Sequence, residues 1–251
     1  MTQSINNLLQ QTGLWRASRI DCNYKSTRST GFQALDEELP GGGWPSDGVT
    51  ELLHDQYGIG EFRLLLPAIT QLSQELTRWL LLVNPPYIPY PPALVQSGVD
   101  LSKIIVSQPK TVKDYLWVLE KALASHSCSI VLCWPGNIHE KQIRRLQVAS
   151  KEGNCWGILF RPESAAAHPS PADLRIRLRP GDSRRDNRTL VARVLKRKGG
   201  WESPDLSLDF NDQLQRPMPD FSEMNIEQPG RLPEFNLPKN DNSRPSSHEY
   251  Q

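Results

Sequence analysis

The residues Gly48–Leu53, with the sequence GVTELL, and residues 54–62 after them, HDQYGIGEF, carry the pattern that decides the fold. The first segment is a short and largely apolar run, which is typical of a buried β-strand. The second contains two glycines and leads into apolar residues at helical spacing: Phe62, Leu65, Leu66, Ile69, Leu72 and Leu76. A strand, a glycine turn and a helix in this order indicate a β-α-β unit. We therefore expect an α/β protein with a largely parallel sheet.

The same alternation continues along the chain. Apolar runs predict four further strands, at residues 79–83, 103–106, 129–134 and 155–160. Helical spacing predicts helices over about 111–123 and 138–150, the first with Thr111 as its N-cap. Two last strands, 173–179 and 189–196, alternate apolar with basic residues. The expected organisation is an N-terminal arm at 1–28, a core at 29–200 and a Pro-rich acidic tail at 201–251.

Residues 54–62 stand where an ATP-binding protein would carry its phosphate-binding loop. Such a loop ends in Gly-Lys followed by Ser or Thr, whereas here Gly58 and Gly60 are followed by Glu61 and Phe62. The Glu61 carboxylate would repel phosphates, and Phe62 has no hydroxyl for Mg²⁺. Neither the strand at 79–83 nor the one at 129–134 is followed by an acid that could hold a metal. We expect a degenerate loop that neither binds nor hydrolyses ATP, no cofactor and no enzyme activity.

Charge is unevenly distributed, although 29 Lys and Arg nearly balance 28 Asp and Glu. Residues 175–198 contain ten basic side chains and two acidic ones. Unpaired cations along one face of a sheet can neutralise DNA phosphates, so this segment is a candidate DNA contact. The candidate residues are Arg175, Arg177, Arg179, Arg184, Arg185, Arg188, Lys196, Arg197 and Lys198. The alternative is a solvated face whose charge the acidic tail partly compensates.

The C-terminal segment has the composition of a disordered tail. Residues 202–251 contain ten acids, four bases and seven prolines without a periodic apolar run. Leu206, Leu208 and Phe210 lie within it as apolar residues in acidic surroundings. Short docking peptides often have this pattern, so the three are candidate partner-binding residues.

Several classes of protein are excluded. The longest apolar runs are far shorter than the ~20 residues that cross a bilayer, and no secretory signal is visible, so we expect a cytoplasmic protein without a membrane partner. No histidine or cysteine spacing is typical of a metal site. The cysteines, which are expected to be reduced, are Cys22, Cys128, Cys133 and Cys155.

Three blocks resemble the opening of a RecA-like recombinase core, and specifically the ImuA family of RecA-related accessory proteins. They are STGFQALD at 29–36, LPGGGWP at 39–45 and VTEL at 49–52. Residues 8–16, LLQQTGLWR, are similar to the N-terminal arm of ImuA proteins. Residues 161–168 and 174–176 resemble both ImuA and SulA, the related SOS-induced inhibitors of cell division.

The resemblance to ImuA implies a RecA-like three-layer core with a mostly parallel central sheet, a degenerate P-loop and a disordered acidic tail. The function it implies is that of a non-catalytic accessory factor in SOS-induced translesion DNA synthesis. Its partners would be an ImuB-like Y-family polymerase homologue and an error-prone replicative polymerase, with RecA or DNA as further candidates.

Two alternatives stay open beside this main interpretation. A SulA-type inhibitor would bind the tubulin-like division protein FtsZ, and Arg78 and Lys103 lie where the SulA family presents its surface to that partner. Both residues also fit as ordinary basic residues flanking strands. An ATP-dependent recombinase would need measurable ATP turnover despite Glu61.

Overall fold

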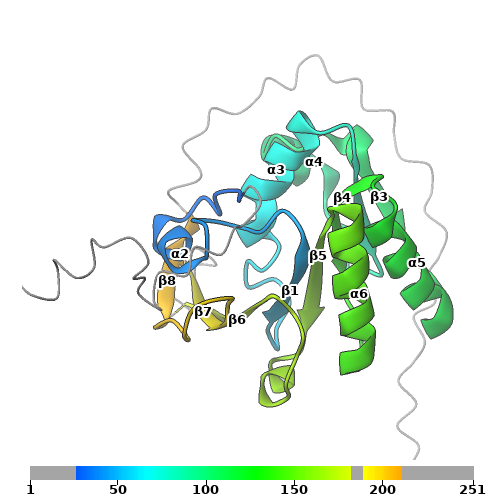
Figure 1. Ribbon diagram of the computed structural model, residues 1–251. Coiled ribbons are helices and arrows are strands. Elements are labelled where there is room, and N and C mark those ends of the chain that lie inside the picture. The colour runs from blue at the N-terminus through cyan, green and yellow to red at the C-terminus, as the bar shows by residue number, and fades with distance from the viewer. Residues whose placement is uncertain (1–26, 182–188, 211–251) are drawn as a thin grey trace, which may run out of the picture. The chain divides into compact units, whose positions relative to one another are not determined.

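The computed structural model describes residues 27–181 and 189–210 of the 251-residue chain (Figure 1). Its strands are β1 (Gly48–Leu53), β2 (Trp79–Val83), β3 (Ile104–Ser107), β4 (Cys128–Cys133), β5 (Trp156–Arg161), β6 (Leu174–Pro180), β7 (Thr189–Lys196) and β8 (Leu206–Asp209). Its α-helices are α2 (Gln33–Glu38), α3 (Leu66–Glu75), α4 (Pro91–Gln96), α5 (Val112–Ala124) and α6 (Glu140–Gly153). Short 3₁₀ turns are η2 (Arg63–Leu65), η3 (Leu101–Lys103) and η4 (Glu163–Ala167).

The strands form one mixed sheet in the order β3-β2-β4-β5-β1-β6-β7-β8. Neighbours from β3 to β6 run parallel, whereas β7 and β8 are added antiparallel. β1 is the first strand in the described part of the chain but lies inside the sheet between β5 and β6. Its Glu51 is opposite Leu159 on one side and Arg175 on the other. The sequence therefore places a carboxylate in the middle of the sheet.

Successive side chains of the parallel strands pack into two separate cores. On β2, Leu80 and Leu82 join the core that contains α3, whereas Leu81 and Val83 join the core that contains α5 and α6. This alternation follows from the two-residue period of a strand whose two faces are both covered. In Figure 1, α5 and α6 lie side by side over one face of the sheet.

The predicted elements agree closely with the structure in position. The strands expected at 48–53, 79–83 and 189–196 have those bounds. Thr111 caps α5 as predicted, because its Oγ1 accepts a hydrogen bond from the Asp114 amide at 3.1 Å. Pro67 lies in the first turn of α3, where a missing amide hydrogen has no intrahelical partner to lose.

The predicted RecA-like core with a degenerate P-loop is wrong. The structure has a mixed sheet of eight strands, and residues 54–62 form no cradle for phosphate. The Gly58 amide donates to Glu61 Oε1 at 3.0 Å, so the loop turns an amide towards its own carboxylate. A Cβ on Gly60 would lie 2.6 Å from the Phe210 ring. Phe210, the residue that follows β8, therefore packs directly on the loop formed by residues 54–62. Phe62 packs against the core.

The boundary predicted between core and tail is also displaced. β8 lies inside the segment expected to be disordered, and Leu208 and Phe210 are fully buried. The Phe210 ring meets Phe32 edge-on with 5.6 Å between ring centroids, and Leu206 is half-buried against the same core. Leu208 and Phe210 are therefore core residues and not an accessible docking peptide. The rest of the predicted tail, 211–251, and most of the predicted arm lie outside the described residues.

No helix within the described ranges is long and apolar enough to cross a membrane.

Candidate functional site

A buried ion cluster occupies the β1, β5 and β6 side of the sheet. Glu51 has no exposed surface, and each of its carboxylate oxygens meets an arginine. Oε1 accepts from Arg161 Nη1 at 2.5 Å and Oε2 accepts from Arg175 Nε at 2.6 Å. Arg175 also donates to the carbonyl oxygens of Ala165, at 2.7 Å, and His168, at 3.0 Å. This cluster is structural, because its charges and hydrogen bonds face inward.

The other described residues of the basic segment also have partners. Arg177 Nη1 lies 3.7 Å from Glu163 Oε1, and Arg179 pairs with the same carboxylate. The Lys196 ammonium donates to the Ser170 carbonyl at 2.7 Å, and burial lowers its pKa. Two more arginines, in β7 and directly after it, form ion pairs: Arg193 with Glu202 at 3.0 Å and Arg197 with Glu38 at 2.7 Å.

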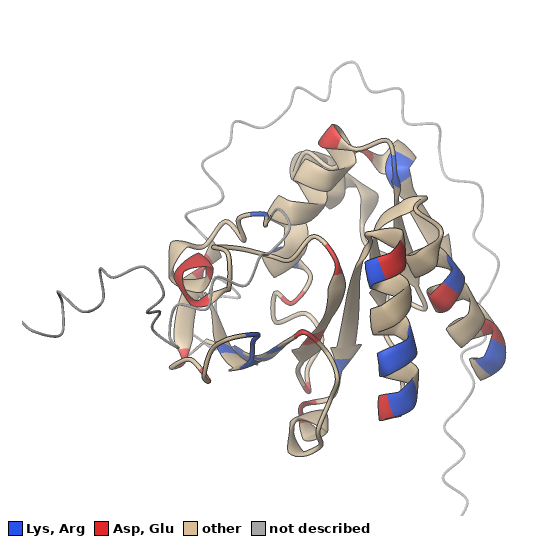
Figure 2. Cartoon of the chain, in the orientation of Figure 1, with Lys and Arg blue, Asp and Glu red and all other residues tan. Residues whose placement is uncertain are grey.

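These contacts remove the main argument for DNA binding by this segment. The prediction needed unpaired cations on one sheet face, but Arg175, Arg177, Arg179, Lys196 and Arg197 are each engaged with an acid or a carbonyl. Lys198 also has an interaction within the fold. Arg184, Arg185 and Arg188 lie outside the described residues. Figure 2 shows Lys and Arg in bands along α6, a helix that the sequence assigned no binding role.

The opposite end of the sheet has a different surface. β3 is the edge strand and pairs with β2 alone among the described strands. Ile105 lies opposite Leu81 and Val106 lies opposite Leu82, so their side chains point to opposite faces. Each is nevertheless 40% exposed, and neither belongs to the buried core on its face of the sheet.

Two further exposed apolar side chains flank this strand. Trp79, at the start of β2, is 42% exposed and Leu101, in η3, is 37% exposed. We call Trp79, Leu101, Ile105 and Val106 the apolar edge. Natural edge strands usually carry charges, prolines or bulges that prevent pairing with another chain, but β3 reads Ile-Ile-Val-Ser. An edge of this kind favours association with a partner.

The two basic residues predicted for partner binding lie at the same end of β2 and β3. Arg78 immediately precedes β2, is half-buried, and donates to the Asn154 carbonyl at 2.8 Å. Lys103 is the last residue of η3 and immediately precedes β3. The structure therefore places Arg78, Trp79 and Lys103 at the same end of β2 and β3.

Three buried thiols lie on β4 and directly before β5. Cys128, Cys133 and Cys155 are free and buried. Burial raises the pKa of the Cys133 thiol from its ordinary value of 9.0 to about 12, and it also raises the pKa values of Cys128 and Cys155. Such thiols are protonated and inert near neutral pH. No group of three His, Cys, Asp or Glu side chains that could hold a metal ion occurs in the described part of the chain.

Comparison with known proteins gives one consistent family. The family model for SulA, described as a cell division inhibitor, matches residues 49–157. This range begins in β1 and ends in β5, so it includes the apolar edge, Arg78 and Lys103 but not β6, β7 or β8.

Curated relatives carry the name cell division inhibitor SulA. The protein of Photorhabdus laumondii is 36% identical over 113 residues, which cover 45% of this chain and 63% of that protein. The protein of Yersinia enterocolitica is 32% identical over 45% of this chain and 67% of its own length. That of Serratia proteamaculans is 30% identical over 46% of this chain and 68% of its own length. The chain thus spans about two thirds of the length of the relatives it matches.

A solved structure of SulA from Pseudomonas aeruginosa also matches. It is 24% identical, and the match covers 45% of this chain and 97% of that chain with a TM-score of 0.38.

These matches overturn the main functional prediction. The chain is not assigned to translesion synthesis, because the matching family model and the relatives described above are SulA. The predicted partners, an ImuB-like polymerase homologue and an error-prone replicative polymerase, lose their support with it. The specific assignment to ImuA is not supported either.

What the resemblance had identified correctly is the broader relationship. The residues that connect this sequence with the matched proteins lie in the part of the sheet from β1 to β5. A relative 30% identical over 68% of its length is sufficient to establish common descent. The chain belongs to the SulA family.

Proposed function

We propose that this protein inhibits bacterial cell division by binding the tubulin-like division protein FtsZ, as a SulA-type inhibitor. Membership of the SulA family supports this proposal, since the relatives described above are named cell division inhibitors. The partner would place the protein in the cytoplasm.

The observation that carries the proposal is the apolar edge. It combines an edge strand, which pairs on one side only among the described strands, with four exposed apolar side chains, and it lies within the matched segment 49–157. Backbone groups on the free side of β3 can pair with an extended segment of a partner, while Trp79 and Leu101 supply apolar contact area. Arg78 and Lys103 add positive charge beside it, which would favour encounter with an acidic surface. The edge is therefore our candidate for the FtsZ contact.

We further propose that inhibition is stoichiometric and needs no ATP hydrolysis. The Gly58 amide is already engaged by the Glu61 carboxylate, and Phe210 packs against Gly60. A loop arranged in this way offers a negative charge where a triphosphate would need donors. The purified protein should show no ATP turnover above a blank, and turnover abolished by a Glu61 substitution would contradict this.

The direct test measures binding of the full chain to FtsZ of the same bacterium and the effect on GTP-dependent polymerisation, followed by light scattering and sedimentation. The wild-type protein should bind FtsZ and lower the mass of polymer in proportion to its concentration. Absence of binding and unchanged polymerisation would overturn the proposed function.

A pair of matched variants tests the surface. Val106→Lys adds a charge to the edge strand, whereas Val148→Lys adds the same charge to α6, where Val148 is 59% exposed. We expect Val106→Lys to weaken FtsZ binding by about tenfold or more, because a lysine on an edge strand opposes strand pairing. Val148→Lys should leave the affinity within about twofold. Equal affinities of both variants, with inhibition retained, would place the contact elsewhere while leaving the function standing.

A further inference from the structure

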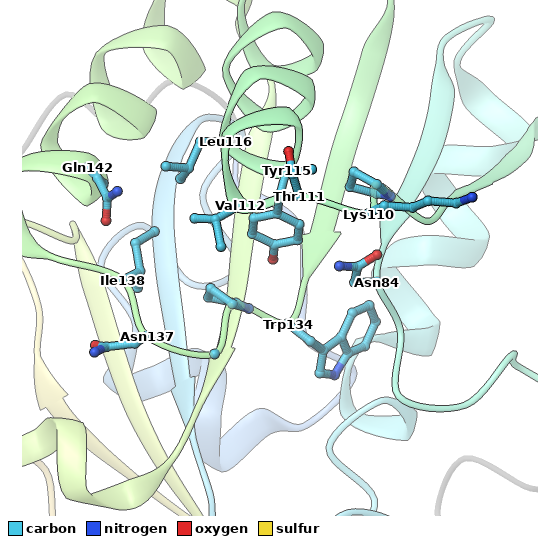
Figure 3. Close-up of a pocket in the computed structure, with 13 residues that line it drawn as sticks. Asn84, Lys110, Thr111, Val112, Tyr115, Leu116, Trp134, Asn137, Ile138 and Gln142 are labelled. Carbon is cyan, nitrogen blue, oxygen red and sulfur yellow. The ribbon is translucent and has the colours of Figure 1, made fainter. Parts of the chain in front are cut away.

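The outward surface of the layer formed by α5 and α6 has no part in the proposed function (Figure 1). Figure 3 shows the inner side of α5, where Tyr115 and Leu116 line a cavity of about 220 Å³. Trp117 points away from the sheet, because two residues turn an α-helix by about 200° from the direction of the buried Tyr115. Trp117 is 61% exposed, so its indole ring is available to a partner.

Lysines lie one helical turn before and one turn after this ring. Lys113 and Lys121 are exposed and are each four residues from Trp117, which places them about 6 Å from it along the helix axis. Lys110, shortly before α5, and Lys141, in the first turn of α6, are also exposed. We call Lys110, Lys113, Trp117, Lys121 and Lys141 the cationic face.

The lysines of the cationic face are unpaired. None of the four forms an ion pair within residues 27–181 and 189–210. Two acids on α5 are already engaged, since Asp114 accepts from the Thr111 hydroxyl at 2.7 Å and Glu120 pairs with Arg145 at 2.6 Å. Residues 110–124 and 140–153 contain seven Lys or Arg against four Asp or Glu, so positive charge is in excess. The four acids are Asp114, Glu120, Glu140 and Glu152.

This surface meets the condition for phosphate binding that the segment 175–198 fails. The described cations of that segment are held by acids or carbonyls of the fold, whereas the four lysines here are free to neutralise phosphates. An exposed aromatic ring among the lysines adds a surface on which an unpaired base can stack. A base on Trp117 keeps its own phosphates near Lys113 and Lys121. The combination fits a single strand, whose bases are free to stack on protein.

The apolar surface of the two helices is divided by charge. Its large exposed side chains are Val112, Trp117 and Val148. The ion pair between Arg145 and Glu120 joins α6 to α5, which places charged groups between the two helices. Helices that lie on a bilayer bury a broad apolar face, and single apolar side chains among charges do not provide one. A nucleic acid therefore fits this surface better than a membrane does.

We propose that the cationic face binds single-stranded nucleic acid without sequence preference. One base stacks on Trp117, and the lysines around it neutralise neighbouring phosphates. The cationic face shares no residue with the apolar edge. Failure of this proposal would therefore leave the proposed contact with FtsZ standing.

The test titrates the full chain into a fluorescently labelled oligothymidylate of about 15 nucleotides, followed by fluorescence anisotropy at about 50 mM salt. The dissociation constant should be about 10 μM or tighter and should rise as salt is added. A DNA duplex of the same length should bind more weakly, because its bases cannot stack on Trp117. Absence of saturable binding, or a preference for the duplex, would overturn the proposal. Binding to phosphatidylglycerol vesicles without binding to the oligonucleotide would overturn it in favour of a membrane.

Two tryptophan variants test the stacking surface. Trp117→Ala removes the ring of the cationic face, whereas Trp201→Ala removes a ring that is 89% exposed and lies outside that face. Trp117→Ala should weaken oligonucleotide binding at least about fivefold. Trp201→Ala should change it by less than about twofold, and both variants should keep the thermal midpoint of unfolding. Equal affinities of the two variants would overturn the proposal.

Two double variants test the lysines at constant net charge. Lys113→Gln with Lys121→Gln removes two unpaired cations, whereas Arg179→Gln with Arg193→Gln removes two that pair with Glu163 and Glu202. The first pair should lower the slope of log affinity against log salt by about 1.4, since each phosphate contact on a single strand contributes about 0.7. The second pair should leave the slope unchanged. An equal decrease in both would mean that net charge alone attracts the strand, and would overturn the proposal.

Discussion

The two ends of the sheet use charge in opposite ways. On the side of β6, β7 and β8, cations are numerous but engaged: Glu51 neutralises two arginines in the interior, and Glu38, Glu163 and Glu202 pair with others. At the other end, β3 itself carries no charged residue, and apolar side chains on and beside it are exposed. The comparison teaches that a high density of basic residues in a sequence says little about binding until it is known which of them form ion pairs within the fold.

The largest effect is expected from deleting β8. A chain that ends after Asp205 loses the buried Leu208 and Phe210, whereas a chain that ends after Phe210 keeps both. Truncating a buried leucine destabilises by about 2–5 kcal/mol and truncating a buried phenylalanine by about 3–5 kcal/mol, so the shorter chain should lose about 5 kcal/mol or more of unfolding free energy. Urea denaturation followed by circular dichroism measures this loss. Equal stability of the two chains would mean that β8 is not part of the sheet in solution.

Next in size is the effect of Glu51→Gln. This variant leaves Arg161 and Arg175 buried without an anion between them, and breaking a buried pair in this way typically destabilises by about 3–5 kcal/mol. Glu163→Gln is the matched control, since its carboxylate is 23% exposed and the arginines it meets are nearer to solvent. Its loss in the same denaturation experiment should be clearly smaller. Similar losses would remove the distinction between the buried cluster and the surface pairs.

The smallest effect concerns pH. The Cys133 thiol ionises near pH 9 in the unfolded chain but near pH 12 in the folded one, so only the unfolded chain gains charge between these values. Folding free energy should therefore be retained below pH 9 and lost as pH rises towards 12, by about 1.4 kcal/mol per pH unit for this thiol. Cys133→Ala should show a shallower decline in denaturation curves taken from pH 9 to 11. A slope unchanged by the substitution would show that Cys133 is already accessible to solvent.

The position of most elements could be predicted because it depends on local pattern. Residues 48–53 form a strand since their apolar run is short and bounded by turns, and Thr111 caps a helix by contacts within one turn. β8 was missed although Leu206, Leu208 and Phe210 alternate with polar residues, because the acidic, Pro-rich composition around them outweighed a short signal.

The candidate site could be predicted only in part, because it depends on pairing between distant segments. The strand at 103–106 was expected, but its place at the edge follows from the strand order, which local periodicity does not contain. Arg175 was taken for a DNA contact because its partner Glu51 lies 124 residues away. Because of this separation, the sequence did not reveal that the buried Glu51 carboxylate pairs with Arg161 of β5 and Arg175 of β6.

The place of β1 in the sheet also affects how soon a newly made chain can function. Its neighbour β5 lies far along the sequence: Trp156, whose indole nitrogen donates to the Thr50 hydroxyl, comes 106 positions after Thr50. A ribosome needs roughly 5 to 20 seconds to synthesise that length. During this time β1 has neither β5 nor β6 to pair with. β2, β3 and β4 are all made in this interval. The residues of the apolar edge, which we propose binds FtsZ, are therefore synthesised before β1 can pair with β5. The earliest time at which the protein can act as an inhibitor is set by the synthesis of β5 and the pairing of β1 with it.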